Sequence, residues 1–139
     1  MEYIQSCVAD QQGEMILKVP KRDDCEKFGK GSLLHNTKEG SVAEYPVRAV
    51  TLDGFLGDVS NLANAMWIDV EGALALVFDG AGRTLRNCQA LYVEMESSAR
   101  WEGQMIDTDV VSSLSAYGLK PVLRDIQKTC LQYNAIFVR

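Results

Sequence analysis

An apolar run that ends in two acidic residues and a glycine constrains this chain more than any other stretch. Residues 66–73 read MWIDVEGA, so a strand-like segment leads directly into Asp69, Glu71 and Gly72. In parallel α/β sheets, the carboxyl ends of strands and the starts of the following helices meet at one crevice, where ligands bind. Asp69 and Glu71 are therefore candidate site residues, because carboxylates placed there can act as acids, bases, ligands or hydroxyl acceptors.

The composition predicts one globular domain over residues 1–139, because this length and a hydrophobic content of 47% suit a single core. The formal net charge of −5 comes without a basic patch, which argues against a nucleic-acid partner. No apolar run is long enough to span a bilayer, and the N-terminus lacks a signal-peptide pattern. We therefore expect a cytoplasmic protein that has no membrane partner.

The cysteines are far apart, and none of them forms a CxxC pair with another. This spacing argues against a zinc site, so no metal site is predicted from the sequence. We interpret the cysteines as reduced thiols, as expected in the cytoplasm. They are Cys7, Cys25, Cys88 and Cys130.

The first third of the chain predicts little regular structure. Residues 3–8 and 14–19 are strand-like and flank a turn at 10–13, so they could form a hairpin. Residues 20–46 are polar and contain several glycines, which predicts a long loop with a short strand at 32–35.

From residue 47 onward, strand and helix patterns alternate, which predicts an α/β sheet. A short connection between the last two strands requires them to be antiparallel, so the sheet is mixed and ends in a C-terminal antiparallel hairpin. The strands are expected at 47–51 (an exposed edge), 65–69, 90–95, 121–125 and 131–138, and the helices at 52–63, 73–78 and from Asp107 to Gly118.

Short patches along the chain match one known family in order. They are CVADQQG at 7–13, SLL at 32–34, VRAVTLD at 47–53, IDVEGA at 68–73, GA at 80–81 with Leu85, and YVE at 92–94. Together these patches resemble the FkbM-type S-adenosylmethionine-dependent methyltransferases. Two departures are Leu74, where the family usually has an acidic residue, and Cys7, where a small residue such as alanine is common. The resemblance covers nearly the whole chain and implies a Rossmann-like methyltransferase fold with S-adenosylmethionine as cofactor.

The same resemblance shows what the chain lacks. Such enzymes hold the cofactor with a glycine-rich turn after the first strand and an acidic residue that ends the second strand. This chain starts at what resembles the third strand, and it contains no GxGxG-like sequence. We therefore expect a truncated domain, the later part of a methyltransferase, that is not catalytic as an isolated chain. The alternative is a non-catalytic, dimerising interaction module built on a remnant of that fold.

The missing strand has a structural consequence. In the family's sheet the first strand lies beside the strand that carries the IDVEG motif, so its absence would leave an apolar edge with unpaired backbone groups. Such edges pair with other chains. We therefore expect a homodimer or a complementing chain along this edge, which consists of Ala65, Met66, Trp67 and Ile68.

For the site residues, a functional interpretation stands beside a structural one. Asp69 and Glu71 would position or deprotonate an acceptor hydroxyl; alternatively, Asp69 caps the next helix and Glu71 is solvated. Glu94 either faces the same crevice as a substrate-binding group or lies at a solvated strand end. By resemblance, Asp10 would bind the adenine amino group, although aspartate also suits a plain turn. Trp101 lies in a loop and could close a pocket over the acceptor.

Overall fold

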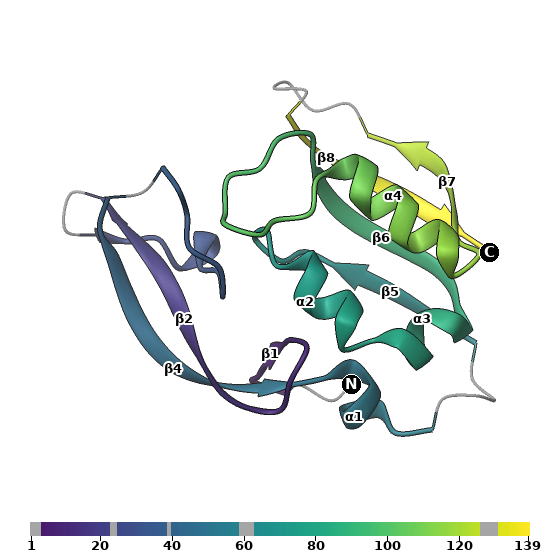
Figure 1. The fold of residues 1–139 in the computed structure, drawn as a ribbon, viewed down its shortest axis with the longest axis horizontal. Coiled ribbons are helices and arrows are strands. Elements are labelled where there is room, and N and C mark those ends of the chain that lie inside the picture. Colours follow the sequence, from purple (N-terminus) through teal and green to yellow (C-terminus); the bar gives the residue numbers. More distant parts are fainter. Residues whose placement is uncertain (1–3, 23–24, 39, 59–62, 126–130) are drawn as a thin grey trace.

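The structure, a computed structural model, describes residues 4–22, 25–38, 40–58, 63–125 and 131–139, which form two four-stranded sheets (Figure 1). In the first sheet, two long strands form an antiparallel hairpin whose register runs from Gly13↔Ala49 to Pro20↔Val42. A short strand adds to each side of this hairpin. In spatial order the strands are β1 (Cys7–Val8), β4 (Val42–Val50), β2 (Gly13–Arg22) and β3 (Cys25–Glu26).

The second sheet contains one parallel pair of strands and two antiparallel pairs. The first two strands run parallel, and the last two form the predicted C-terminal hairpin, which pairs antiparallel with the parallel pair. The mixed sheet expected from the sequence is therefore confirmed in this half of the chain. In spatial order the strands are β5 (Asn64–Ile68), β6 (Cys88–Glu96), β8 (Gln132–Val138) and β7 (Lys120–Arg124).

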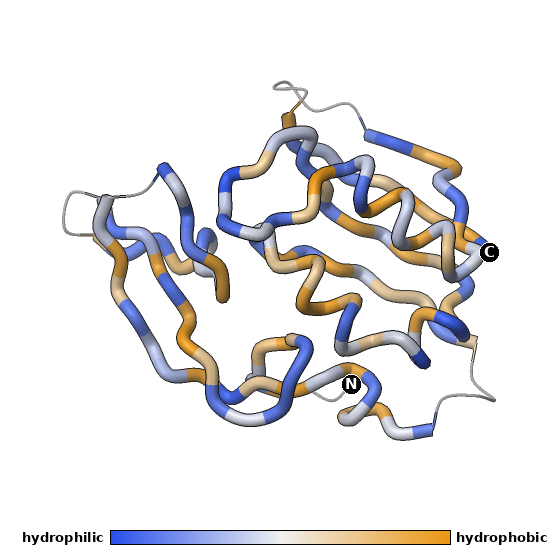
Figure 2. Tube along the Cα trace, in the orientation of Figure 1, coloured by the Kyte–Doolittle hydropathy of each residue, from blue (hydrophilic) through white to orange (hydrophobic). Residues whose placement is uncertain are grey.

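Helices cover one face of the second sheet and create the main hydrophobic core (Figure 1). Figure 2 shows hydrophobic stretches on these helices and on the strands behind them. The most deeply buried side chains include Leu85, Leu91, Val93, Leu114 and Phe137, all with no exposed surface. The helices are α1 (Leu52–Leu56), α2 (Leu74–Asp79), α3 (Gly82–Asn87) and α4 (Asp107–Ala116), with a short 3-10 helix, η1 (Phe28–Lys30), beside the first sheet.

Several predicted elements agree with the structure. The strand at 65–69, the helix at 73–78 and the final hairpin appear within one or two residues of the expected bounds. Helix α4 starts at Asp107 as expected, and Gly118 follows it with a φ of 80°, the left-handed conformation that ends a helix.

The predicted loop at 20–46 is wrong at both ends, because β2 continues to Arg22 and β4 begins at Val42. The short strand expected at 32–35 is reduced to an isolated bridge between Ser32 and Lys18. The predicted exposed edge at 47–51 is wrong for Ala49 and Val50, since β1 pairs with these residues on the side away from β2.

The helix predicted at 52–63 is shorter than expected. Helix α1 ends at Leu56, where Gly57 has a φ of 66°, and residues 59–62 lie outside the described residues. The six-residue helix α3 was not predicted. Residue 3 of the first predicted strand also lies outside the described residues, and β1 is confined to Cys7–Val8. The hairpin expected between 3–8 and 14–19 is wrong, because β1 pairs in parallel with β4, which lies between β1 and β2.

Asp53 connects two helices. It lies in the first turn of α1, and its carboxylate also accepts hydrogen bonds from the backbone N–H groups of Arg83 (2.8 Å) and Thr84 (2.9 Å) at the start of α3. Burial alone would raise the pKa of Asp53, but these hydrogen bonds, with that from the Thr84 hydroxyl, lower it overall. The ionised carboxylate therefore holds α1 against α3.

At Gly80 the end of α2 lies close against the backbone beside β1. A Cβ atom at this position would lie 2.1 Å from the carbonyl oxygen of Ala9, a fully buried residue next to β1. We expect Gly80→Ala to lower the free energy of unfolding by about 1–3 kcal/mol, because the backbone of Ala9 must move to admit a methyl group. Urea unfolding measures this change. The matched control is Gly29→Ala, where a Cβ would meet nothing within 4 Å; equal losses in both variants would contradict the prediction.

Candidate functional site

The turn between β5 and α2 carries the acidic motif. After Ile68, Asp69 is exposed and Glu71 is half-buried. The chain then turns at Gly72, which has a φ of 72°. A Cβ on Gly72 would lie 2.7 Å from the Trp101 ring. Only glycine suits this position, because it must adopt a left-handed conformation and leave room for an indole ring.

A cleft of about 450 Å³ lies between the two sheets, next to this turn. Asp69, Glu71 and Glu94 line it from the second sheet, so the structure brings three of the predicted site residues to one place. The opposite wall comes from the first sheet and the segment that follows β3. Its residues include Cys7, Val8, Leu17, Phe28, Gly31 and Ser32.

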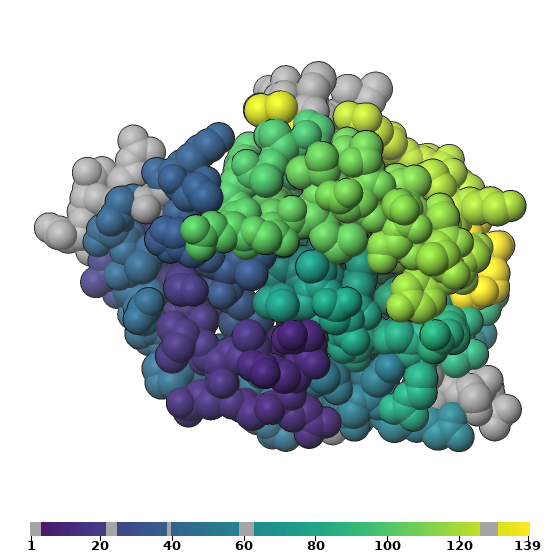
Figure 3. Space-filling model, in the orientation of Figure 1, coloured from purple at the N-terminus to yellow at the C-terminus, as the bar shows by residue number. Residues whose placement is uncertain are grey.

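Backbone contacts hold this wall against the second sheet. The buried Ser32 hydroxyl donates a hydrogen bond of 2.5 Å to the carbonyl oxygen of Glu71. On the next segment, the N–H of Thr37 donates to the carbonyl of Arg100, and the N–H of Glu102 donates to that of His35. Figure 3 shows the surface where the blue segment of the first half meets the green segment near residue 100.

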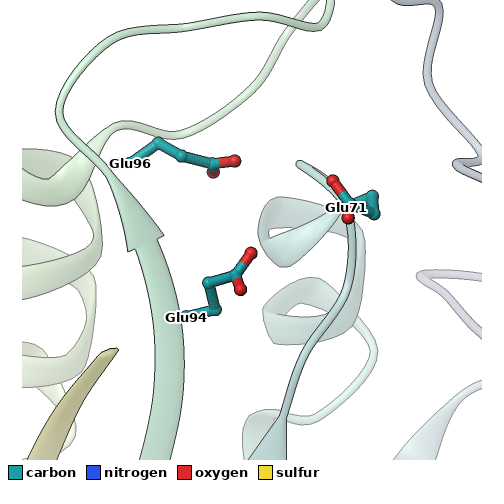
Figure 4. Close-up of side chains that lie close together, drawn as sticks. All are labelled: Glu71, Glu94 and Glu96. Atoms are coloured by element: carbon teal, nitrogen blue, oxygen red, sulfur yellow. The ribbon is translucent and has the colours of Figure 1, made fainter. Parts of the chain in front are cut away.

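Three glutamates gather at the strand-end side of the cleft (Figure 4). Glu71 comes from the β5–α2 turn, whereas Glu94 and Glu96 come from the end of β6 and share one face of that strand. One carboxylate oxygen from each residue lies within 4.8 Å of the others. Amide side chains orient two of them, since Gln132 donates to Glu94 and the buried Gln104 donates to Glu96.

The environment raises the pKa of all three glutamates. Burial is the largest cause of the raised pKa of Glu71 and of Glu94, and neighbouring acidic groups add to it. Lys30 and Arg100 oppose the shift at Glu71, and the hydrogen bond from Gln132, followed by Arg100, opposes it at Glu94. Burial, Glu94 and Glu71 together raise the pKa of Glu96 to about 7. Three carboxyl groups this close cannot all ionise without mutual repulsion, so the cluster binds protons near neutral pH more strongly than ordinary glutamates do.

The structure places two other predicted site residues away from the cleft. Asp10 is exposed in a bend after β1, and the described residues that line the cleft do not include it. Trp101 is only 4% exposed, and its ring packs over Gly72. Trp101 lines a second, smaller hollow together with Glu71 and Arg100, so it lies next to the cleft rather than in it.

Sequence reasoning missed Glu96 and Gln104. A signal for Glu96 was present, because Glu94 and Glu96 are two residues apart on a strand and must therefore point to the same side. Gln104 lies in the loop before α4, and no local pattern indicates that it reaches back to Glu96.

Cys7 is the cysteine in the cleft. It is half-buried, and burial raises the pKa of its thiol, which disfavours the reactive thiolate. Within the described residues, Cys7, Cys25 and Cys88 are free thiols, while Cys130 lies outside them.

The sheet order and the acidic strand ends define the class of this protein. It is a mixed α/β protein with parallel and antiparallel strand pairs, and its cleft lies where the parallel strands β5 and β6 end. The Methyltransferase FkbM domain family matches residues 3–121, so the chain belongs to this family, and the predicted resemblance is confirmed. The family is one of S-adenosylmethionine-dependent enzymes, which gives the chain a methyltransferase-related function.

Two further comparisons give no relatives. Comparison with curated proteins found no match, and comparison with solved structures found none. Among the described residues, no helix has the length and apolar character needed to cross a membrane.

Glu96 makes protein stability depend on pH. Its pKa in the folded state, about 7, exceeds the ordinary value of 4.5, so its stabilising contribution is complete below about pH 4.5 and is lost as the pH rises through 7. We expect the wild type to lose about 2 kcal/mol of unfolding free energy relative to Glu96→Gln between pH 5 and pH 8. Urea unfolding at both pH values, with EDTA present, measures this difference.

Glu14→Gln is the control for this experiment, because Glu14 is exposed on β2. Its unfolding free energy should follow that of the wild type at both pH values. Parallel curves for the wild type and Glu96→Gln would show that Glu96 titrates like an exposed carboxyl group.

Proposed function

We propose that the cleft between the sheets is the methyl-acceptor side of an FkbM-type methyltransferase site. The observation that carries this proposal is the convergence of Asp69, Glu71 and Glu94 on one cleft of about 450 Å³. A cleft of this size suits a small molecule or the end of a larger one. The acceptor group would lie against the acidic wall, and the apolar side chains of Leu17 and Phe28 opposite would contact its hydrocarbon part.

In this proposal Glu71 accepts a hydrogen bond from an acceptor hydroxyl group and then takes its proton. The raised pKa of Glu71, caused first by burial, supports this role because it makes the carboxylate a stronger base than an ordinary glutamate. Asp69 is exposed at the rim and would orient the same hydroxyl group. Methyl transfer depends mainly on the alignment of the reacting groups, so positioning is the larger contribution expected of these residues.

The described residues do not fit the whole of S-adenosylmethionine. Nowhere among them does a glycine-rich turn connect a buried strand to a helix, which is the feature that lets a backbone approach such a cofactor. The turn after β5 has one glycine, and the Trp101 ring already fills the space beside it. We therefore propose that this chain alone does not catalyse methyl transfer, and that the cofactor-binding turn comes from another polypeptide segment.

That segment, or a second copy of this chain, would add along the edge of β5 that faces away from β6. Within the described residues, β5 pairs with β6 alone, and Trp67 is 76% exposed. The Trp67 ring packs edge-on against Tyr92 and presents its other surface to solvent. As a second candidate function, we propose that the chain dimerises along β5.

Ligand binding tests the acceptor-side proposal. In a saturation-transfer NMR screen, we expect small hydroxylated fragments to bind the wild type, to bind Glu71→Ala at least tenfold more weakly, and to bind Glu14→Ala equally well. In calorimetric titration, S-adenosylhomocysteine should give no saturable heat with this chain alone. Saturable heat that is lost in Asp69→Ala would overturn the proposal that the cofactor needs another segment. Fragments that bind the wild type and Glu71→Ala with equal affinity would overturn the proposed acceptor site.

Light scattering at several protein concentrations tests dimerisation. We expect a dimer that Trp67→Glu converts to a monomer, because a charge on this strand disfavours pairing. Val122→Glu is the matched control, since Val122 is 59% exposed on β7 at the opposite edge of the same sheet. A monomer at every concentration would exclude the dimer, and a dimer lost in Val122→Glu alone would assign it to β7.

A further inference from the structure

The three-glutamate cluster has the geometry of a cation site. Glu71, Glu94 and Glu96 come from two separate elements, yet one oxygen from each lies within 4.8 Å of the others. Oxygens that share a Ca²⁺ ion at 2.3–2.6 Å lie at most about 5 Å apart. In Figure 4, all three carboxylates extend into the same space between β6 and the β5–α2 turn.

The burial and hydrogen bonding of Glu96 are an independent indication that a ligand binds in this space. Its side chain is 96% buried, given an exposed fraction of 4%, and Gln104 binds only its Oε2 atom. Its Oε1 atom is buried and has no hydrogen-bond partner among the residues that the structure describes. Burial of a carboxylate oxygen without a hydrogen-bond partner destabilises the folded state. A bound cation would remove this cost and would also remove the repulsion between the neighbouring carboxylates.

The groups around the cluster resemble the outer layer of a metal site. Gln104 fixes Glu96 from one side and Gln132 fixes Glu94 from the other, so two of the three carboxylates are already oriented. In metal sites, hydrogen bonds of this kind orient the ligands and increase affinity. Glu71 and Glu94 also line the cleft, which gives an ion a path from solvent and leaves coordination positions open toward the cleft.

We propose that Glu71, Glu94 and Glu96 bind one divalent cation of the oxygen-preferring class, with a size near that of Ca²⁺. The donor set contains only carboxylates, whereas zinc and copper sites use histidine or cysteine, neither of which belongs to this cluster. Ca²⁺ accepts oxygen ligands in a flexible geometry, whereas Mg²⁺ requires oxygens at about 2.0–2.1 Å in a nearly ideal octahedron, so Ca²⁺ is the better match for three carboxylates on two separate elements. This site would make the prediction of no metal, drawn from the cysteine spacing, wrong.

Arg100 competes with the cation. Arg100 and Glu71 line the same small hollow, so the positive charge of Arg100 partly neutralises the cluster when no ion is bound. Replacement of Arg100 by glutamine should therefore tighten cation binding, because the full negative charge of the cluster becomes available. A cluster that only shares protons would show no such gain.

Calorimetric titration of the full chain with CaCl₂ at pH 8 tests the site. We expect one saturable Ca²⁺ per chain, at least tenfold weaker binding in Glu94→Gln and in Glu96→Gln, tighter binding in Arg100→Gln, and unchanged binding in Glu14→Gln. Two glutamate variants are used so that a folding defect in one, seen by circular dichroism, does not remove the test. No saturable heat, or equal binding by all variants, would overturn the proposal.

Terbium luminescence gives a second readout. Tb³⁺ replaces Ca²⁺ at oxygen sites, and the Trp101 ring, which packs over the residue after Glu71, is close enough to sensitise it. We expect emission that Ca²⁺ displaces and that Glu96→Gln abolishes; emission that persists in this variant would place the ion elsewhere. Neither experiment uses an acceptor or a cofactor, so its outcome is independent of the proposed methyl-acceptor function.

Discussion

The close packing of the Trp101 ring against the backbone of Gly72 holds the site together. Because Gly72 has no side chain, the indole ring seats directly on the turn that follows β5, and the loop before α4 is fixed above the strand ends. That loop also contains Gln104, whose amide oxygen accepts hydrogen bonds from the N–H groups of Arg100 and Trp101 while its nitrogen donates to Glu96. One buried amide therefore determines both the shape of the loop and the orientation of the innermost glutamate.

The same loop joins the two sheets. Trp101 forms an isolated bridge with Asn36, and Thr37 and Glu102 add backbone hydrogen bonds between the segment after η1 and this loop. Ser32 completes the contact by donating its hydroxyl hydrogen to the carbonyl of Glu71. These hydrogen bonds connect the acidic wall of the cleft to the segment that follows the first sheet.

The second half of the chain was predictable because its patterns are local. Periodicity and turn chemistry predict the strand ends near Ile68 and Glu96, the left-handed glycine at 118 and the final hairpin. They also predict that Asp69, Glu71 and Glu94 lie close together. The first sheet was predictable only in part. The strand patterns at 14–19 and 47–51 overlap β2 and β4, but the full length of these strands was missed because Pro20 and Pro46 lie within them. Proline is tolerated where a strand has a neighbour on one side only, and β1 reaches only residues 49–50 of β4. Glu96 and Gln104 depend on a contact between residues that are eight positions apart in the sequence, which no local pattern encodes.

The edge of β5 that is unpaired among the described residues meets the acidic cleft at Asp69. Asp69 follows the last residue of β5, so a strand added along that edge would end beside the rim of the acidic cleft. In parallel sheets the carboxyl ends of neighbouring strands form the ligand crevice together, and a strand paired with β5 in the parallel sense would bring its own terminal turn to the same place. The edge of β5, which pairs with no other described strand, is thus also the position from which a cofactor-binding turn could complete the cleft. This geometry links the proposed assembly to the proposed methyltransferase function.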